Sequence, residues 1–239
     1  RRMLAYDPRG QEEVTAASNL PAELVEQARL AGTEADPAHD FGHVLRVCES
    51  VRRICAGEAV SERDTQVAVT AALLHELFNY PKQHPQSNLS GDVCAEHAAA
   101  ALAQLDYEAP FIAAVSACIR DHGFSKGVTP DSLPARLLQD ADRLDAIGAI
   151  GIARWAATCN AMGTQFYAPE DPFCDARAPD DKRFGIDHFY QKLLRIEATL
   201  HTRTARQVAR ERSQYMREFL TQLQNELPTE HPPTMKPLC

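Results

Sequence analysis

The sequence is poor in the features that mark membrane, secreted and thiolate-metal proteins. It has no apolar run near the roughly 20 residues that a membrane-spanning helix needs, and its start lacks the apolar centre of a signal peptide. Its seven cysteines are scattered, odd in number and form no Cys-x-x-Cys pair, which argues against a disulfide framework or a thiolate zinc site. We therefore expect a cytoplasmic protein that does not bind membranes.

Positive charge is also in the minority. Lys and Arg number 25 against 33 Asp and Glu, which gives a formal net charge of −8. This balance opposes the wrapping of a nucleic-acid duplex and confines anion binding to local clusters of Lys and Arg. A phosphate-bearing substrate would therefore need such a cluster near its site.

The alternation of apolar and polar residues that predicts strands is almost absent, and helical periodicity dominates. We predict an all-α, single-domain helical bundle, because the hydrophobic content of 44% is sufficient for a buried core. The predicted helices span residues 21–32, 39–56, 61–76, 92–105, 110–121, 135–160 and 186–227.

Residues 163–185 are rich in Pro, Asp and aromatic residues without periodicity, and they predict an active-site lid. The predicted organisation is an N-terminal helix with its lead-in, a metal-binding core, a lid with C-terminal helices, and a disordered tail. These four parts span residues 1–37, 38–160, 161–228 and 229–239.

Imidazole and carboxylate groups gather in short segments that lie far apart along the chain. The segments are His39-Asp40-Phe41-Gly42-His43, Leu73-Leu74-His75-Glu76, His97, His122 and residues 139–145. These side chains bind a borderline or hard divalent ion without sulfur, and a charge in an apolar helical stretch needs a partner. The pattern predicts one metal site and therefore an enzyme.

The same motifs, in this order, resemble those of the HD-domain metal-dependent phosphohydrolase superfamily, and especially a bacterial branch of small HD nucleotide phosphohydrolases. The resemblance covers residues 38–227 and implies an HD-type helical bundle. It is carried by His39-Asp40-x-x-His43-x-x-Arg46-Val47, Lys82-x-His84-Pro85, residues 139–151, Glu170-Asp171-Pro172-Phe173 and Asp180-Asp181-Lys182-Arg183.

The resemblance implies that one divalent ion is held by His43, His75, Glu76 and Asp142, the ion being Mn, Fe, Zn, Co, Ni or Mg. The His-Asp pair that names the family is His75-Glu76 here. Glutamate keeps the charge and both acceptor oxygens but moves them one methylene further from the backbone. We expect Glu76 to bind the metal with a geometry that its longer side chain alters.

A bound ion of this kind lowers the pKa of water and provides hydroxide to attack phosphorus. The negative charge that develops on the phosphoryl oxygens needs cationic donors close to the ligands. We predict catalytic roles for His122, Lys82 and Arg46, and substrate contacts for His84, Arg143, Asp145 and Lys182.

Several of these residues have an ordinary structural alternative. Arg143 could pair with Asp145 or another acid, and Lys82 could be a solvated loop lysine. Asp40 and Asp140 are each interpreted as helix caps from their positions.

His97 and His122 raise the question of a second ion. Some HD proteins that resemble this one hold a second metal with a histidine on the helix after the His-Asp pair and another at the end of the next helix. His97 and His122 occupy these two places. We expect the alternative, in which one ion is bound, His97 is an exposed helical residue and His122 contacts the substrate phosphate or its attacking water.

Three functions remain open from the sequence. The favoured one is hydrolysis of a phosphate ester or anhydride, with a nucleotide as the small-molecule partner, by a protein that could form a homodimer. The second is a dinuclear iron oxygenase, and the third is a catalytically weakened HD module that binds a nucleotide. Metal count separates the first two functions, and hydrolysis separates the first from the third.

Overall fold

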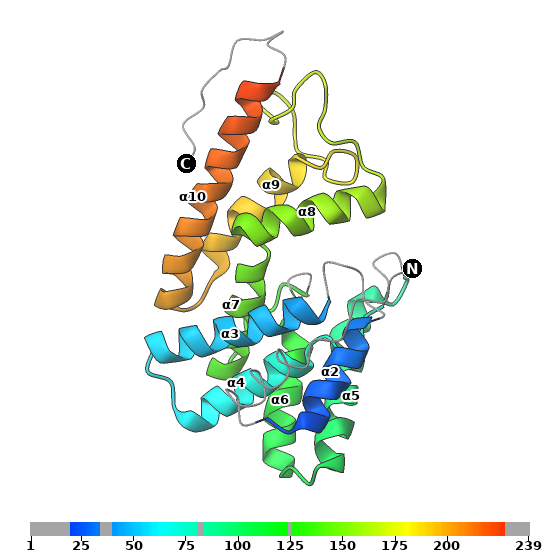
Figure 1. Cartoon of the computed structure of the whole chain (residues 1–239), viewed down its shortest axis with the longest axis vertical. Coiled ribbons are helices and arrows are strands. Elements are labelled where there is room, and N and C mark those ends of the chain that lie inside the picture. Colours follow the sequence, from blue (N-terminus) through cyan, green and yellow to red (C-terminus); the bar gives the residue numbers. More distant parts are fainter. Residues whose placement is uncertain (1–19, 34–39, 81–83, 124–125, 228–239) are drawn as a thin grey trace. The chain divides into compact units, whose positions relative to one another are not determined.

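The computed structural model describes residues 20–33, 40–80, 84–123 and 126–227, and every regular element in these ranges is a helix (Figure 1). The prediction of an all-α protein is therefore confirmed. The chain forms two compact units that divide between Asp142 and Arg143. The four-part division predicted from the sequence stays a prediction.

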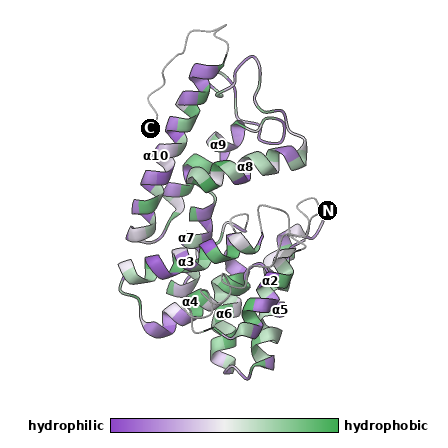
Figure 2. Ribbon diagram, in the orientation of Figure 1, coloured by the Kyte–Doolittle hydropathy of each residue, from purple (hydrophilic) through white to green (hydrophobic). Residues whose placement is uncertain are grey.

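The first unit is built around a helix that is buried on nearly every side. This helix, α4, packs against α2, α3 and α6, while α5 packs against α6. All residues of α4 from 67 to 74 are buried, as its continuous apolar sequence predicts, and Figure 2 shows the hydrophobic residues in green. The helices of this unit are α2 (Ala22–Thr33), α3 (Phe41–Gly57), α4 (Glu62–Leu74), a short 3-10 helix η1 (Ser87–Leu89), α5 (Ser90–Gln104), α6 (Ala109–Asp121) and α7 (Leu133–Asp145), whose last three residues belong to the second unit.

Side-chain caps fix where the two helices next to the site begin. The Asp40 carboxylate accepts from the backbone N–H of His43 at 2.9 Å, and the Ser61 hydroxyl accepts from that of Asp64 at 3.1 Å. The interpretation of Asp40 as a cap is confirmed. The same interpretation of Asp140 is wrong, because this residue lies inside α7 and is fully buried.

The prediction of one helix over residues 135–160 is also wrong. The chain instead forms α7 and then α8 (Gly148–Met162), with a break between them. Gly148 has φ +79°, a conformation that other residues rarely adopt, and its N–H lies 3.1 Å from the Met216 sulfur. A Cβ on Gly151 would lie 2.3 Å from the Ala146 carbonyl oxygen. Apolar periodicity continues through the break and therefore conceals it.

The C-terminal region of the second unit is not the continuous helix predicted over residues 186–227. It forms α9 (Asp187–Gln191), a 3-10 helix η3 (Leu193–Thr199) and α10 (Arg203–Glu226). Leu200 is extended, and the Thr202 side chain then caps α10 by accepting from the Ala205 N–H at 3.2 Å. This threonine cap explains why the last helix begins anew.

Residues 163–185 are irregular, as predicted, and two carboxylates organise them. Asp171 accepts from the backbone N–H groups of Asp175, Ala176 and Arg177, at 2.9 to 3.1 Å. The Arg177 guanidinium binds both oxygens of Asp187 at 2.5 and 2.7 Å. Burial alone would raise the pKa of Asp171 and Asp187, but these hydrogen bonds outweigh it and lower both pKa values. The lid role of this segment stays a prediction.

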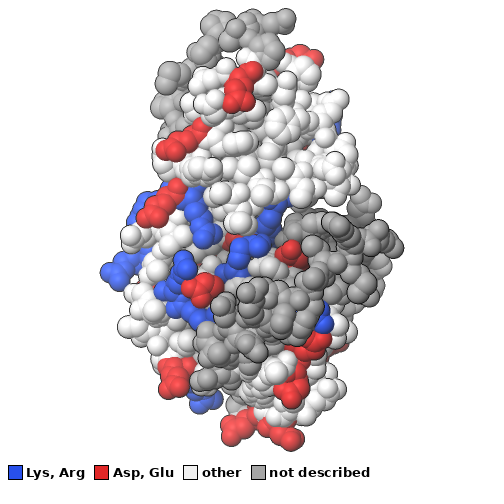
Figure 3. Space-filling model, viewed as in Figure 1, with Lys and Arg blue, Asp and Glu red and all other residues white. Residues whose placement is uncertain are grey.

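The surface carries both signs of charge. The face shown in Figure 3 carries both acidic and basic side chains of the described residues. Among the described helices, none is both long and apolar enough to span a membrane.

Candidate metal centre

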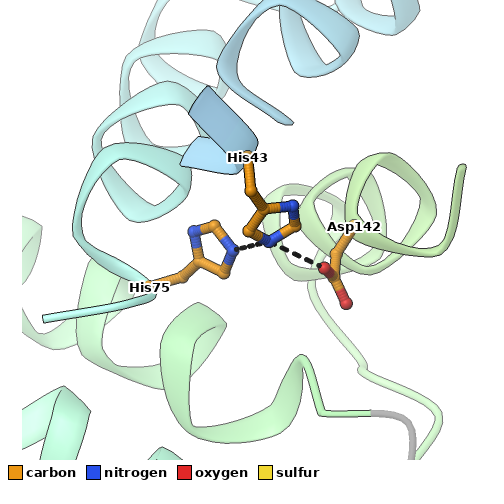
Figure 4. A group of neighbouring side chains, drawn as sticks. All are labelled: His43, His75 and Asp142. Carbon is orange, nitrogen blue, oxygen red and sulfur yellow. Dashed lines mark hydrogen bonds and ion pairs between the residues drawn. The ribbon is translucent and has the colours of Figure 1, made fainter. Parts of the chain in front are cut away.

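Three helices of the first unit bring two histidines and an aspartate together. His43 lies in the first turn of α3, His75 ends α4, and Asp142 lies in α7. One potential ligand atom from each residue lies within 4.8 Å of the others, and Figure 4 shows how the side chains converge. Both histidines are buried, whereas 24% of the Asp142 side chain is exposed. The cluster is therefore accessible from the side of Asp142.

Two of the distances within this cluster are close to those between the ligands of a bound divalent ion. His43 Nε2 lies 3.2 Å from His75 Nε2 and 3.5 Å from Asp142 Oδ1. Ligand atoms that lie about 2.1 Å from one ion are separated from each other by about 3.0 to 3.4 Å. Two imidazole nitrogens and a carboxylate oxygen are also a donor set that suits Zn, Fe, Mn, Co or Ni. The residues therefore fit the metal that the sequence predicts.

The surroundings of His75 prepare it to bind a metal through Nε2. Its Nδ1 lies 2.7 Å from the Ala72 carbonyl oxygen, so the ring proton is assigned to Nδ1 and the lone pair to Nε2. Burial lowers the pKa of His75 to about 4, against an opposing effect of the Glu76 carboxylate. The imidazole is therefore neutral at neutral pH, as a metal ligand must be.

Glu76 lies beside this cluster at slightly longer range. Its Oε1 is 3.7 Å from His43 Nε2 and 3.8 Å from His75 Nε2, and 8% of its side chain is exposed. The other oxygen, Oε2, accepts a hydrogen bond from the Asn79 amide. Asn79 is not among the residues predicted from the sequence, although its place three residues after Glu76 is a signal for such a contact. One oxygen of Glu76 faces the histidines while Asn79 orients the other.

His122 lies next to the cluster, whereas His97 faces solvent. The ring of His122, at the end of α6, is perpendicular to that of His75, with ring centroids 5.3 Å apart. Its Nδ1 lies 2.6 Å from the Ile119 carbonyl oxygen, which assigns the lone pair to Nε2. His97 on α5 is exposed, and its ring lies 5.4 Å from that of Phe78. The expectation of a single ion, with neither His97 nor His122 holding a second one, stays a prediction.

The other predicted residues of the first unit differ in how closely the structure places them. A Cβ built on Gly42 would lie 3.4 Å from Arg46 Nη1 and 3.2 Å from Asp40 Oδ1, so the guanidinium lies over the first turn of α3. The His84 ring stacks on Tyr80 with centroids 4.5 Å apart. Lys82 lies outside the described residues.

Three predicted substrate-binding residues belong to the second unit. Arg143 is buried and its Nη1 donates to the Thr199 carbonyl oxygen at 2.7 Å. Asp145 is buried and forms a salt bridge with Arg154 at 2.7 Å. Lys182 is exposed. The structure thus gives Arg143 and Asp145 structural contacts, and the substrate roles of all three stay predictions.

Known proteins share the sequence of this region. The model of the HD-domain family matches residues 40–147, which include all four predicted metal ligands. The Bacillus subtilis protein YpgQ is 30% identical over 196 residues, which cover 82% of this chain and 88% of YpgQ.

Solved structures extend the similarity over nearly the whole chain. YpgQ in complex with ADP is similar with a TM-score of 0.64 and 29% identity, covering 86% of this chain and 98% of that one. A Lactobacillus plantarum protein gives 0.69 and 28%, with 92% and 98% covered. An HD-superfamily hydrolase from Bacillus thuringiensis gives 0.66 and 27%, with 90% and 97% covered.

Proposed function

Because this chain belongs to the HD-domain family, we propose that it is a metal-dependent phosphohydrolase that cleaves a phosphate ester or anhydride of a nucleotide. The observation that carries this proposal is the convergence of His43 Nε2, His75 Nε2 and Asp142 Oδ1 at 3.2 and 3.5 Å. The similarity to an HD-superfamily hydrolase supports the reaction class. The structure of YpgQ with ADP supports a nucleotide ligand.

His43, His75, Asp142 and Glu76 are the residues that would hold the ion. When bound, a divalent ion supplies Lewis-acid activation of water and of the phosphoryl group. The chain must keep these ligands deprotonated and oriented, which the Ala72 carbonyl does for His75 and Asn79 does for Glu76.

Two further side chains are suited to act on the substrate. The lone pair on His122 Nε2 can accept a proton or a hydrogen bond, because Nδ1 is held by the Ile119 carbonyl. The Arg46 guanidinium provides positive charge over the first turn of α3, the turn that carries His43, where it can stabilise phosphoryl oxygens. Arg46 therefore contributes to binding and charge stabilisation, and His122 to proton transfer.

A hydrolysis panel tests the proposal. Nucleoside mono-, di- and triphosphates would be incubated with the chain and with Mn, Fe, Zn, Co, Ni or Mg in turn, and released phosphate and pyrophosphate would be measured. We expect turnover that a chelator abolishes and that added metal restores. Nucleotide binding without turnover in any metal would instead identify a weakened binding module.

The prediction for Glu76 concerns the extra methylene of its side chain. Glu76→Asp should raise turnover by about ten- to a hundredfold, because the shorter side chain restores the family geometry and misplacement by about 1 Å has an effect of that size. Steady-state kinetics on a nucleotide, with manganese supplied, checks this. If Glu76→Asp instead abolishes activity that the natural chain shows, the site is built for glutamate, and the weakened-module alternative fails with it.

A further inference from the structure

His122 opens the connection between α6 and α7, which spans residues 122–132. It directly follows α6, at the point where a helix ends and its last carbonyl groups lack partners within the helix. Gly123 comes next, and Gly127 has a φ of +63°. Apart from chain neighbours, a Cβ built on either glycine would meet none of the described residues within 4 Å. Contacts from outside the connection therefore decide how firmly the end of α6 is held.

One such contact comes from Gln139 in the middle of α7. Its Nε2 donates to the Asp121 carbonyl oxygen at 3.0 Å and to the Val128 carbonyl oxygen at 2.9 Å. The orientation of the amide follows from these two partners, because a carbonyl oxygen can only accept. Asp121 is the last residue of α6 and precedes His122. One side-chain nitrogen therefore joins the end of α6 to the connection that follows it.

The helix that carries Gln139 holds this side chain in place. Gln139 is 0% exposed, and Leu138 and Ala141 on the same helix are equally buried. Close packing of this kind leaves a side chain little freedom to change its conformation. Asp142, a predicted metal ligand, lies three residues after Gln139, and residues with this spacing are neighbours on a helix. The same stretch of α7 thus provides a metal ligand and the contact to the end of α6.

A side-chain amide is suited to this pair of contacts. Both acceptors are neutral carbonyl oxygens, and the amide nitrogen offers two N–H groups without a charge. The ring of His122 is tied to the same turn of α6, because its Nδ1 lies 2.6 Å from the Ile119 carbonyl oxygen. A displacement of this turn therefore moves His122 Nε2 with it.

We propose that Gln139 is a positioning residue for His122, which fixes where the lone pair of His122 Nε2 stands beside His75. This role rests on the proposed function, since it matters for catalysis only if His122 acts on the substrate. The anchoring of the His122 ring can be measured without turnover. Misplacement of a reacting group by about 1 Å lowers a rate by up to about a hundredfold, so loss of the anchor should reduce kcat.

Steady-state kinetics of Gln139→Met, His122→Ala and the double variant test this role, with the nucleotide and metal that give the highest turnover. We expect Gln139→Met alone to lower kcat by about tenfold, with KM and metal content little changed. In His122→Ala the same substitution should change kcat by less than about twofold, because an anchor has no effect once the group that it positions is gone. Gln139→Glu, which keeps the side-chain length, replaces the methionine variant if that variant does not fold.

Arg136→Met is the matched control. Arg136 lies one turn earlier on α7, and its Nε donates to the Pro130 carbonyl oxygen of the same connection at 2.8 Å. The control also removes a contact between α7 and this connection, but at a carbonyl eight residues after His122. Its kcat should stay within about twofold of the natural value, because substitutions at distant sites act independently.

Nitrogen NMR of the isotope-labelled, zinc-loaded full chain measures the anchoring directly. The ring signals of His122 are assigned by their absence from His122→Ala. They should shift or broaden in Gln139→Met and stay unchanged in Arg136→Met. The ring signals of the exposed His97 should be unchanged in both variants and serve as the internal reference.

Three kinetic outcomes would overturn the proposal. They are a natural kcat in folded Gln139→Met, an equal fall in Arg136→Met, and an equal effect of Gln139→Met with and without His122. If the natural chain hydrolyses no nucleotide, the proposed function fails and the spectra decide on the anchoring alone. His122 ring signals that Gln139→Met leaves unchanged would then show that Gln139 does not position this imidazole.

Discussion

Replacing His75 with alanine should remove most of the bound metal and lower the melting temperature by about 5 to 10 °C. The first effect follows because His75 Nε2 is one of the three converging ligand atoms and lies 3.2 Å from His43 Nε2. The second follows because a ligand at a hundred times its dissociation constant stabilises the folded state by about 2.7 kcal/mol, and each kcal/mol shifts the melting temperature by about 2 to 4 °C. Metal analysis and calorimetry measure both effects.

The matched control for this variant is His97→Ala. It also removes an imidazole from a helix of the first unit, but His97 is exposed and its ring contacts Phe78. It should therefore keep both the metal and the melting temperature of the natural chain. A His75→Ala variant with unchanged metal content would remove His75 from the ligands.

His122→Ala should abolish most hydrolysis, lowering kcat by about a hundredfold or more while leaving the metal bound. The His122 ring lies 5.3 Å from that of His75 with its Nε2 lone pair available, but it is not a member of the ligand group formed by His43, His75 and Asp142. A loss of rate without a loss of metal separates a substrate-contacting imidazole from a ligand.

The metal content of His122→Ala decides between the two roles of this imidazole. A variant that loses metal in parallel with activity would instead make His122 a ligand, and the catalytic role would fail.

The centre of the fold could be read from the sequence because its signals are local. The continuous apolar run of α4 predicts a buried helix, and the Asp40 cap marks the turn that carries His43. The order of His43, His75 and Asp142 in these helical settings then predicts the metal cluster that the structure brings together.

Features that depend on backbone conformation or distant contacts could not be read in this way. Periodicity continues across the break before Gly148, whose φ of +79° shows only in three dimensions. Arg143 pairs with Thr199, 56 positions away, and Asp145 pairs with Arg154, 9 positions away. The sequence does not reveal these pairings and could not choose between substrate contact and structural pairing. Substrate contact was therefore predicted for two side chains to which the fold gives structural partners.

Metal quantification on chain purified without chelator is the decisive measurement. We expect about one ion per chain, retained in His97→Ala and lost in His75→Ala, because the cluster offers one set of converging ligands. Two equivalents of iron, reduced to about one in His97→Ala and accompanied by oxygen consumption, would contradict the phosphohydrolase assignment in favour of a dinuclear oxygenase.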